Sequence, residues 1–190
     1  MIIATTISRP AELDGVRRQF KRFGNDLRVI ALSVPEGIPE EQVWLVNDMN
    51  KRDVNWTRRI FEMFLKTSDD ILVKTDPDSI FSDDETTFAP LRKSDVAGDF
   101  RRAQLGMVFL GGFQYYTRHA CEVILADKKF EGFCIFQDVE LAKAIARNKL
   151  IAYNMPGVNS HWVAGDAKKY VVIHHGNGTL KRLKGGRVIL

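Results

Sequence analysis

The chain has 190 residues, 45% of them hydrophobic, with 28 Lys and Arg against 24 Asp and Glu. A chain of this length buries enough apolar surface to fold without disulfides or a structural metal. Cys121 and Cys134 lie in apolar stretches, so we expect two buried, unpaired thiols. The apolar run at residues 1–7 is too short for a signal peptide, and no stretch is long enough to span a membrane. These features argue against a disulfide scaffold or a membrane-spanning protein, and we expect a cytoplasmic location.

Charge is distributed unevenly along the chain. Residues 1–95 have a net charge of −3, whereas residues 96–190 have a net charge of +7. The acidic side chains concentrate at residues 69–85, and after Asp166 the chain has six basic residues and no acid. The charge distribution by itself favours the interpretation that both segments are solvated surfaces. The alternative that it leaves open is a metal site that faces an anion.

The hydrophobic pattern of the first 75 residues alternates strands with helices. A strand at 2–6 precedes a helix that begins at Ser8-Arg9-Pro10 and ends at Gly24-Asn25. A strand at 27–32, a helix at 40–49, a helix at 54–66 and a strand at 71–74 follow. This order predicts parallel strands covered by helices, and hence an α/β sheet.

The second half has a less regular pattern. We predict a strand at 107–110 that ends in Gly111-Gly112, helices at 118–126 and 137–148, and strands at 150–153 and 170–174. Because no linker or repeat divides the chain, we predict a single α/β domain over 1–190 with a mainly parallel central sheet flanked by helices. Within it, residues 167–190 form a basic C-terminal segment that we expect to be mobile.

The sharpest local signal is Asp76-Pro77-Asp78, directly after the strand at 71–74. With fifteen Asp in the chain, about one such pair occurs by chance, so its position at a strand end is what carries the prediction. Ligands of open α/β sheets bind at the carboxyl ends of strands. In extended backbone both carboxylates would point the same way, and paired carboxylates suit Mg²⁺ or Mn²⁺. The competing interpretation is a solvated acidic turn.

These residues resemble the Asp-x-Asp motif of glycosyltransferases with the GT-A fold. Three downstream segments extend the resemblance in the same chain order. The first is Gly111-Gly112, which is similar to a segment that lines the sugar pocket. The second is Phe136-Gln-Asp-Val-Glu-Leu, which is similar to a segment that opens a later helix. The third is Val-Val-Ile-His174-His175-Gly176. The resemblance implies a nucleotide-sugar-binding sheet and a metal-dependent sugar transfer. The family within this fold is unresolved.

The resemblance also implies roles for individual residues. Asp78 would bind Mn²⁺ or Mg²⁺ directly, with Asp76 reaching a metal-bound water or the ribose. His175, or else His174, would be the third ligand. Only one of them can bind the metal, because the side chains of adjacent strand residues point in opposite directions. Asp138 would be the general base of an inverting transfer, although Gln137 replaces the acid that precedes it in the family. Each residue also has a structural interpretation, such as an acid at a helix N-terminus for Asp138.

Further residues are implied in binding the donor, for which a UDP-sugar is the commonest choice. The GT-A fold holds the base and ribose at the end of the first strand, where this chain has Thr5, Thr6, Ser8 and Arg9. Gly111 and Gly112 would lie at the sugar. Arg58 could approach the nucleotide, with a surface arginine as the alternative. Lys181 and its basic neighbours could fold over the diphosphate.

Three functions therefore compete. The leading one is a glycosyltransferase whose acceptor is a glycan or, in an enzyme of viral or phage origin, a modified DNA base. A sugar-1-phosphate nucleotidyltransferase shares the sheet and an Asp-bearing metal site, but residues 4–10 lack the Gly-rich loop usual in that class. A non-catalytic nucleic-acid-binding protein would explain the pI near 9.1 and the basic tail.

Overall fold

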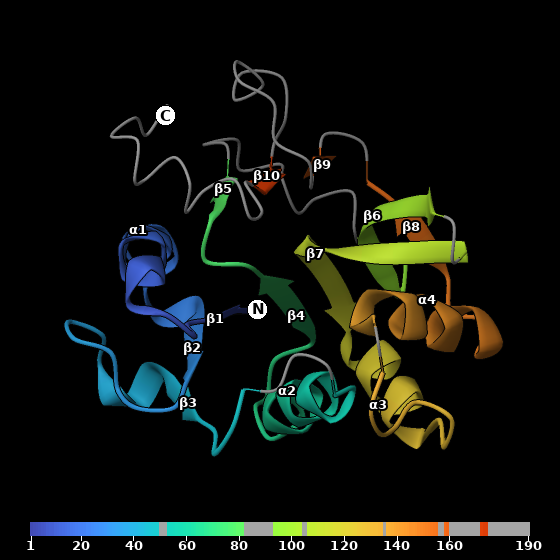
Figure 1. The fold of residues 1–190 in the computed structure, drawn as a ribbon, viewed down its shortest axis with the longest axis horizontal. Helices are drawn as coiled ribbons and strands as arrows, with labels where there is room; N and C mark the ends of the chain where they lie inside the picture. Colours follow the sequence, from blue (N-terminus) through green and yellow to red (C-terminus); the bar gives the residue numbers. More distant parts are fainter. Residues whose placement is uncertain are drawn as a thin grey trace.

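The computed structural model describes residues 1–49, 53–81, 93–103, 106–134, 136–155, 158–159 and 172–174. Within these residues, ten strands form a seven-stranded sheet of order β3-β2-β1-β4-β7-β6-β8 and a three-stranded sheet of order β5-β10-β9 (Figure 1). The strands of the large sheet are β1 (Ile2–Thr6), β2 (Leu27–Ala31), β3 (Val43–Leu45), β4 (Ile71–Thr75), β6 (Val96–Ala103), β7 (Gly106–Thr117) and β8 (Ala152–Asn154). The small sheet contains β5 (Ser79–Phe81), β9 (Val158–Asn159) and β10 (Val172–His174).

The large sheet is mainly parallel. Strands β3, β2, β1 and β4 pair in parallel, as do β6 and β8, while β7 runs antiparallel to its two neighbours β4 and β6. The prediction of a mainly parallel α/β sheet is confirmed. The small sheet lies beyond the carboxyl end of β4, which leads into β5 through residues 76–78 (Figure 1).

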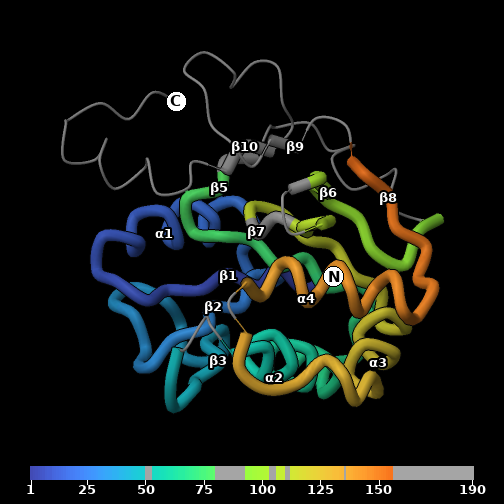
Figure 2. Tube along the Cα trace, turned by 45° about the vertical axis from the view of Figure 1, so that its right-hand side comes forward, coloured from blue at the N-terminus to red at the C-terminus, as the bar shows by residue number. Residues whose placement is uncertain are grey.

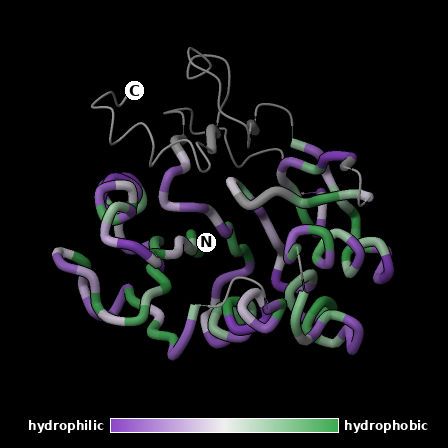
Figure 3. The backbone as a smooth tube through the Cα atoms, viewed as in Figure 1, coloured by the Kyte–Doolittle hydropathy of each residue, from purple (hydrophilic) through white to green (hydrophobic). Residues whose placement is uncertain are grey.

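Helices cover both faces of the large sheet. They are α1 (Leu13–Phe23), α2 (Asn55–Leu65), α3 (Arg118–Ala126) and α4 (Gln137–Arg147), with 3₁₀ turns at Pro10–Glu12, Gly24–Asp26 and Glu40–Gln42. Helix α1 packs through Val16 on a core that includes Ile3 and Val73. Helices α2, α3 and α4 form a second core with Leu72 and Tyr116 on the other face, and they lie apart from α1 (Figure 2). Hydrophobic segments accordingly occur both beside α1 and in α3 and α4 (Figure 3).

Several predicted elements are confirmed. Helices α2 and α3 match the predictions at 54–66 and 118–126, α4 matches 137–148 to within one residue at its end, and β1, β2 and β4 match their strands. Cys121 and Cys134 are buried and free, as expected. None of the helices in the described part of the chain is long and apolar enough to cross a membrane.

Other predictions are wrong because pairing between distant strands decides the structure. The helix at 40–49 is replaced by a 3₁₀ turn and β3, whose backbone pairs with the edge of β2. The strand at 107–110 does not end at Gly111-Gly112, since β7 continues through both glycines to Thr117 between β4 and β6. Strand β6 was not predicted, and a β-bulge interrupts its pairing after Gly98.

Candidate active site

The Asp76-Pro77-Asp78 segment forms a turn after β4. The backbone N–H of Ser79 donates to the carbonyl of Asp76 at 3.0 Å, so residues 76–79 close a turn that we call the acidic turn. Pro77 fixes φ at the second position of such a turn. The expectation that extended backbone would align the two carboxylates is therefore wrong. The roles of Asp76 and Asp78 as metal ligands stay a prediction.

Helix α1 packs tightly against the acidic turn. A Cβ atom on Gly15 would lie 2.1 Å from the carbonyl oxygen of Pro77, so a side chain at this position cannot fit without moving the turn. The Gln19 side-chain amide, 2% exposed, donates to the carbonyl of Asp76 at 2.7 Å. The glycine within an otherwise helical pattern was the only sequence signal for this approach.

Arg18 on α1 lies within electrostatic reach of the acidic turn. Desolvation lowers the pKa of Arg18, while the negative charges of Asp78 and Asp14 raise it. The guanidinium is therefore a positive charge close to the Asp78 carboxylate. The resemblance did not include Arg18, because nothing in its local sequence separates it from the other basic residues of an exposed helix face.

The Gly111-Gly112 segment lies beside the acidic turn. The hydroxyl groups of Thr75 and Ser79 both donate to the carbonyl of Gly112, at 3.1 and 2.6 Å. Strand pairing places Thr75 opposite Phe113, which fixes this register. Two segments that are more than thirty residues apart in the sequence therefore meet at the end of β4.

Strand β10 brings a third predicted segment to the same place. Its residue His174 pairs with Ser79 in an antiparallel register, so its backbone lies across from the residue that follows Asp78. His175, Lys181 and all of 167–190 except 172–174 lie outside the described residues. Within the described residues, no group of three His, Cys, Asp or Glu side chains could hold a metal ion. Two nearby carboxylates nonetheless match the oxygen ligands that Mn²⁺ and Mg²⁺ prefer.

Asp138, the second residue of α4, faces a buried polar network on β4 and β7. The Gln114 amide nitrogen lies 3.5 Å from Asp138 Oδ1 and donates to the Phe109 carbonyl at 2.9 Å. The Gln114 amide oxygen accepts from Lys74 Nζ at 3.2 Å and from the Tyr116 hydroxyl at 2.8 Å. Lys74, Gln114 and Tyr116 are all buried.

This network fixes which way the Gln114 amide points. A lysine ammonium can only donate, so the amide oxygen of Gln114 must face Lys74 and its nitrogen must face Asp138. Burial, with smaller contributions from Cys121 and Asp138, raises the pKa of Tyr116 well above its ordinary value, so its hydroxyl remains a donor. Neither Lys74 nor Gln114 was predicted to be part of a site.

Gln137 anchors the start of α4. Its side-chain oxygen accepts from the Thr57 hydroxyl at 2.9 Å, and its nitrogen donates to the backbone carbonyl of Asp53 at 2.9 Å. A glutamate could not make the second bond because an ionised carboxylate only accepts. The glutamine at this position therefore ties α4 to α2 and holds the helix turn that carries Asp138.

The residues at the end of β1 fall into two groups. Thr5 and Thr6 are buried, and among the described residues Thr5 Oγ1 has no hydrogen-bond partner. Ser8 and Arg9 instead contact Glu12. The Glu12 carboxylate accepts from both of their backbone N–H groups, from the Ser8 hydroxyl and from the Arg9 guanidinium at 2.6–3.1 Å.

Arg58 lies in the packing between helices. Its guanidinium donates to the backbone carbonyls of Phe130 at 2.9 Å and Leu125 at 2.8 Å, which joins α2 to the end of α3 and the loop that follows. These contacts give Arg58 a structural role, and we do not include it in the donor site proposed below.

No family model matches the chain, and no curated protein sequence matches it either. Solved structures do resemble it. A glycosyltransferase involved in glycosylation of the major capsid of PBCV-1 is 9% identical, with a TM-score of 0.61 over 97% of both chains. A variant of Drosophila β1,4-galactosyltransferase 7, in complex with manganese, UDP-Gal and xylobiose, is 14% identical, with a TM-score of 0.53 over 95% of this chain and 73% of that one. The bifunctional IspDF of Campylobacter jejuni is 11% identical, with a TM-score of 0.56 over 90% of this chain and 54% of that one.

These comparisons establish the fold. The chain has a GT-A-like fold, as the resemblance implied, and its mainly parallel sheet flanked by helices fits that class. Identities of 9–14% show likeness of fold alone. The family within this fold is not identified.

Proposed function

We propose that this protein is a metal-dependent glycosyltransferase that moves a sugar from a nucleoside diphosphate sugar, of which a UDP-sugar is the leading candidate, to an acceptor hydroxyl. The observation that carries the proposal is the meeting of three distant segments at the end of β4. The acidic turn, the Gly112 carbonyl and the backbone of His174 adjoin one another in a GT-A-like fold.

In this proposal the residues of the acidic turn bind the donor diphosphate through a divalent cation. Asp78, Asp76 and a histidine of β10 or the residue after it would hold Mn²⁺ or Mg²⁺, which would stabilise charge on the departing nucleoside diphosphate. Arg18 lies close to Asp78 and would add a positive charge at the same place. Thr5 and Thr6 at the end of β1 would face the nucleoside, and Gly111 and Gly112 the sugar.

Asp138 would accept the proton of the acceptor hydroxyl as its oxygen attacks the anomeric carbon, which gives inversion. The Gln114 amide nitrogen supports this role because a donor facing a carboxylate favours its ionised form. Lys74 and Tyr116 hold the amide in the required orientation.

The nucleotidyltransferase alternative is weakened by the loop between β1 and α1. A triphosphate bound there would need free backbone N–H donors. The Glu12 carboxylate already accepts from the N–H groups of Ser8 and Arg9, and its negative charge would repel a phosphate. We therefore favour sugar transfer over nucleotidyl transfer.

A thermal-shift titration with nucleoside diphosphates, with and without Mn²⁺, tests the proposal. At one hundred times Kd, binding adds about 2.7 kcal/mol to the free energy of unfolding, which corresponds to a rise in Tm of roughly 5–10 °C. We expect this rise only with Mn²⁺, and we expect Asp78→Asn to abolish it. Asp26→Asn, at an exposed aspartate in the 3₁₀ turn that follows the C-terminal end of α1, is the matched control.

The absence of a Mn²⁺-dependent rise with every nucleoside diphosphate would contradict the proposal. If a donor is found, NMR of the first-formed product reports its anomeric configuration. Retention of configuration would remove Asp138 from the role of base.

A further inference from the structure

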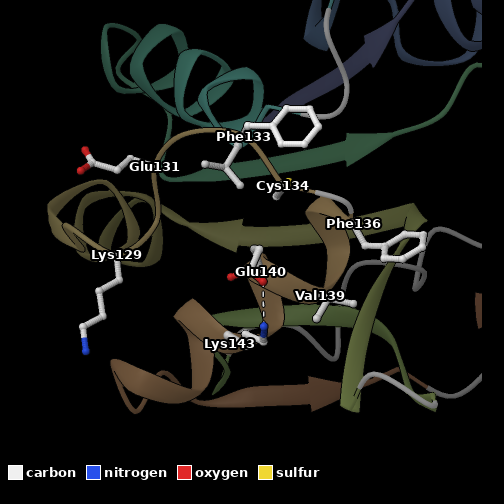
Figure 4. A pocket seen from close by; sticks show the side chains of 9 residues that line it. Lys129, Glu131, Phe133, Cys134, Phe136, Val139, Glu140 and Lys143 are labelled. Atoms are coloured by element: carbon white, nitrogen blue, oxygen red, sulfur yellow. Dashed lines mark hydrogen bonds and ion pairs between the residues drawn. The ribbon is translucent and has the colours of Figure 1, made fainter.

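A cavity of about 310 Å³ lies beside α4 (Figure 4), and none of the residues that line it belongs to the acidic turn. It is bounded by α4, the start of α2 and the loop between α3 and α4. Its apolar lining comprises Val54, Phe133, Cys134, Phe136 and Val139. This volume is at the lower end of the range of small-ligand sites.

Two phenylalanines at this cavity are unusually exposed. Phe133 is 73% exposed and Phe136 is 54% exposed, although each could bury its ring in a core at a gain of about 2 kcal/mol. In Figure 4 the two rings lie on one side of the cavity, while Lys129 and Glu131 lie on the other. Exposed aromatic rings beside a cavity provide apolar faces on which a ligand can stack.

The charged residues of the cavity balance one another. Lys129 and Lys143 are matched by Glu131 and Glu140, and Lys143 donates to Glu140 at 2.7 Å. A zero net charge does not attract a polyanion such as DNA, whose binding depends on an excess of Lys and Arg. It suits a neutral ligand that presents apolar faces to the rings and hydroxyl groups to the carboxylates and ammonium groups, which is the chemistry of a carbohydrate.

The cavity and Asp138 use different sides of α4. Glu140 lies about 200° around the helix axis from Asp138, by the roughly 100° per residue of an α-helix. Phe136, which lines the cavity, is the N-cap residue of α4 and lies two residues before Asp138. A ligand that occupies the cavity and also reaches Asp138 would therefore lie across the N-terminal end of α4.

We propose that this cavity binds the non-reacting sugars of a neutral oligosaccharide acceptor, with Phe133 and Phe136 stacking on sugar rings. The inference rests on the proposed function for the direction in which the oligosaccharide lies, but the cavity binds it without donor or metal. It assigns the acceptor to the glycans, and not to modified DNA bases.

Saturation-transfer NMR with cellotriose, xylotriose and maltotriose, without metal or nucleotide, tests the assignment. We expect at least one trisaccharide to bind in the millimolar range, and we expect Phe133→Ala and Phe136→Ala each to weaken that binding at least fivefold. Tyr153→Ala, which removes a partly exposed aromatic ring on β8, is the matched control and should leave binding unchanged. Because Phe133 is 73% exposed, its replacement should leave Tm nearly unchanged.

Three results would overturn the assignment. They are no saturation transfer to any of the trisaccharides, binding that neither phenylalanine substitution weakens, and a DNA duplex that competes with the trisaccharide at this site. Asp78→Asn separates this inference from the proposed function. If Asp78→Asn abolishes Mn²⁺-dependent nucleotide binding but keeps trisaccharide binding, both stand, whereas a wild-type protein that binds trisaccharide and no nucleotide would retain the cavity assignment alone.

Discussion

The acidic turn and Asp138 are held in place by different kinds of contact. Contacts to backbone carbonyls hold the acidic turn, since Gly15 packs on the Pro77 carbonyl and the side chains of Gln19 and Ser79 donate to the carbonyls of Asp76 and Gly112. Side chains hold Asp138, because the Gln114 amide that faces it is oriented by Lys74 and Tyr116.

This difference determines how each part can be damaged. A turn packed against the backbone of a helix should not tolerate added volume at the point of closest approach. A carboxylate held by a side-chain network should tolerate small changes of volume but not the exchange of a donor for an acceptor. The following substitutions test that distinction, from those expected to affect function most to those expected to affect stability alone.

Gly15→Ala should disable the acidic turn. Its Cβ would lie 2.1 Å from the Pro77 carbonyl oxygen, so the turn or the helix must move. We expect a loss of about 1–3 kcal/mol in the free energy of unfolding, and at least a tenfold weaker Mn²⁺-dependent nucleotide affinity, measured by calorimetry.

Gly24→Ala is the control for this substitution. A Cβ on Gly24 meets no atom within 4 Å, but its φ of +52° makes alanine unfavourable. This variant should lose about 1 kcal/mol of stability while it retains nucleotide affinity. Equal losses of affinity in both variants would show that general destabilisation, and not the turn, is responsible.

Gln114→Glu should impair Asp138 with little change in shape. The new carboxylate still accepts from Lys74 and Tyr116, but it no longer donates to Asp138 or to the Phe109 carbonyl and adds a negative charge next to Asp138. A neighbouring negative charge raises the pKa of a carboxyl group, so the acid limb of the pH–rate profile should move to higher pH. On the acid limb, below the pKa of the base, we expect kcat to fall about tenfold, as a shift of roughly one pKa unit in a general base would cause, with little change near neutral pH.

Tyr116→Phe separates orientation from packing. It removes one donor to the Gln114 oxygen, while Lys74 still fixes the amide. Stability should fall by about 1 kcal/mol, with the pH–rate profile unmoved.

If Gln114→Glu leaves the acid limb of the pH–rate profile where it is in the wild-type protein, Asp138 is not the titrating base.

Arg58→Ala should affect stability alone. Its guanidinium donates to the carbonyls of Phe130 and Leu125, and the substitution removes this donor from both carbonyls. We expect urea denaturation to show a loss of about 2 kcal/mol, with nucleotide affinity unchanged. A weaker nucleotide affinity in a stably folded variant would return Arg58 to the donor site.

The smallest effect concerns the buried thiol of Cys121 on the α3 side of the sheet. Burial raises its pKa strongly, so the folded protein keeps the proton at a pH where the unfolded chain loses it. Because the folded state then binds more protons, stability falls as pH rises above the unfolded pKa of about 8.5. Between pH 7.5 and 9.5 the free energy of unfolding should fall by about 1 kcal/mol, and Cys121→Ala should remove most of this slope.

Much of the fold was predictable because local periodicity coincides with burial. Strands β1, β2 and β4 are covered on both faces and read as continuous apolar runs, and α2, α3 and α4 have apolar residues at helical spacing. Strand β6 was missed because its sequence, Val-Ala-Gly-Asp-Phe-Arg-Arg-Ala, contains a glycine bulge and two arginines. Such a segment becomes a strand only through β7 beside it.

The candidate site divides along the same line. The order and residue types of the acidic turn, Gly111-Gly112, Asp138 and His174 could be read from the sequence, since a motif and its distance from a strand are local properties. The contacts that hold them could not. Gly15, Gln114 and Lys74 act through partners between 24 and 62 residues away in the chain, which no local pattern reports.

The sequence by itself therefore determined a mainly parallel α/β sheet and the chemical groups at the end of its fourth strand. Only the tertiary structure decided that the acidic segment is a closed turn, that Arg58 joins two helices, and that the Gln114 nitrogen faces Asp138. The physical reason is that hydrophobic periodicity depends on residues that are neighbours along the chain. The orientation of a side-chain amide depends instead on which donors and acceptors from distant parts of the chain surround it.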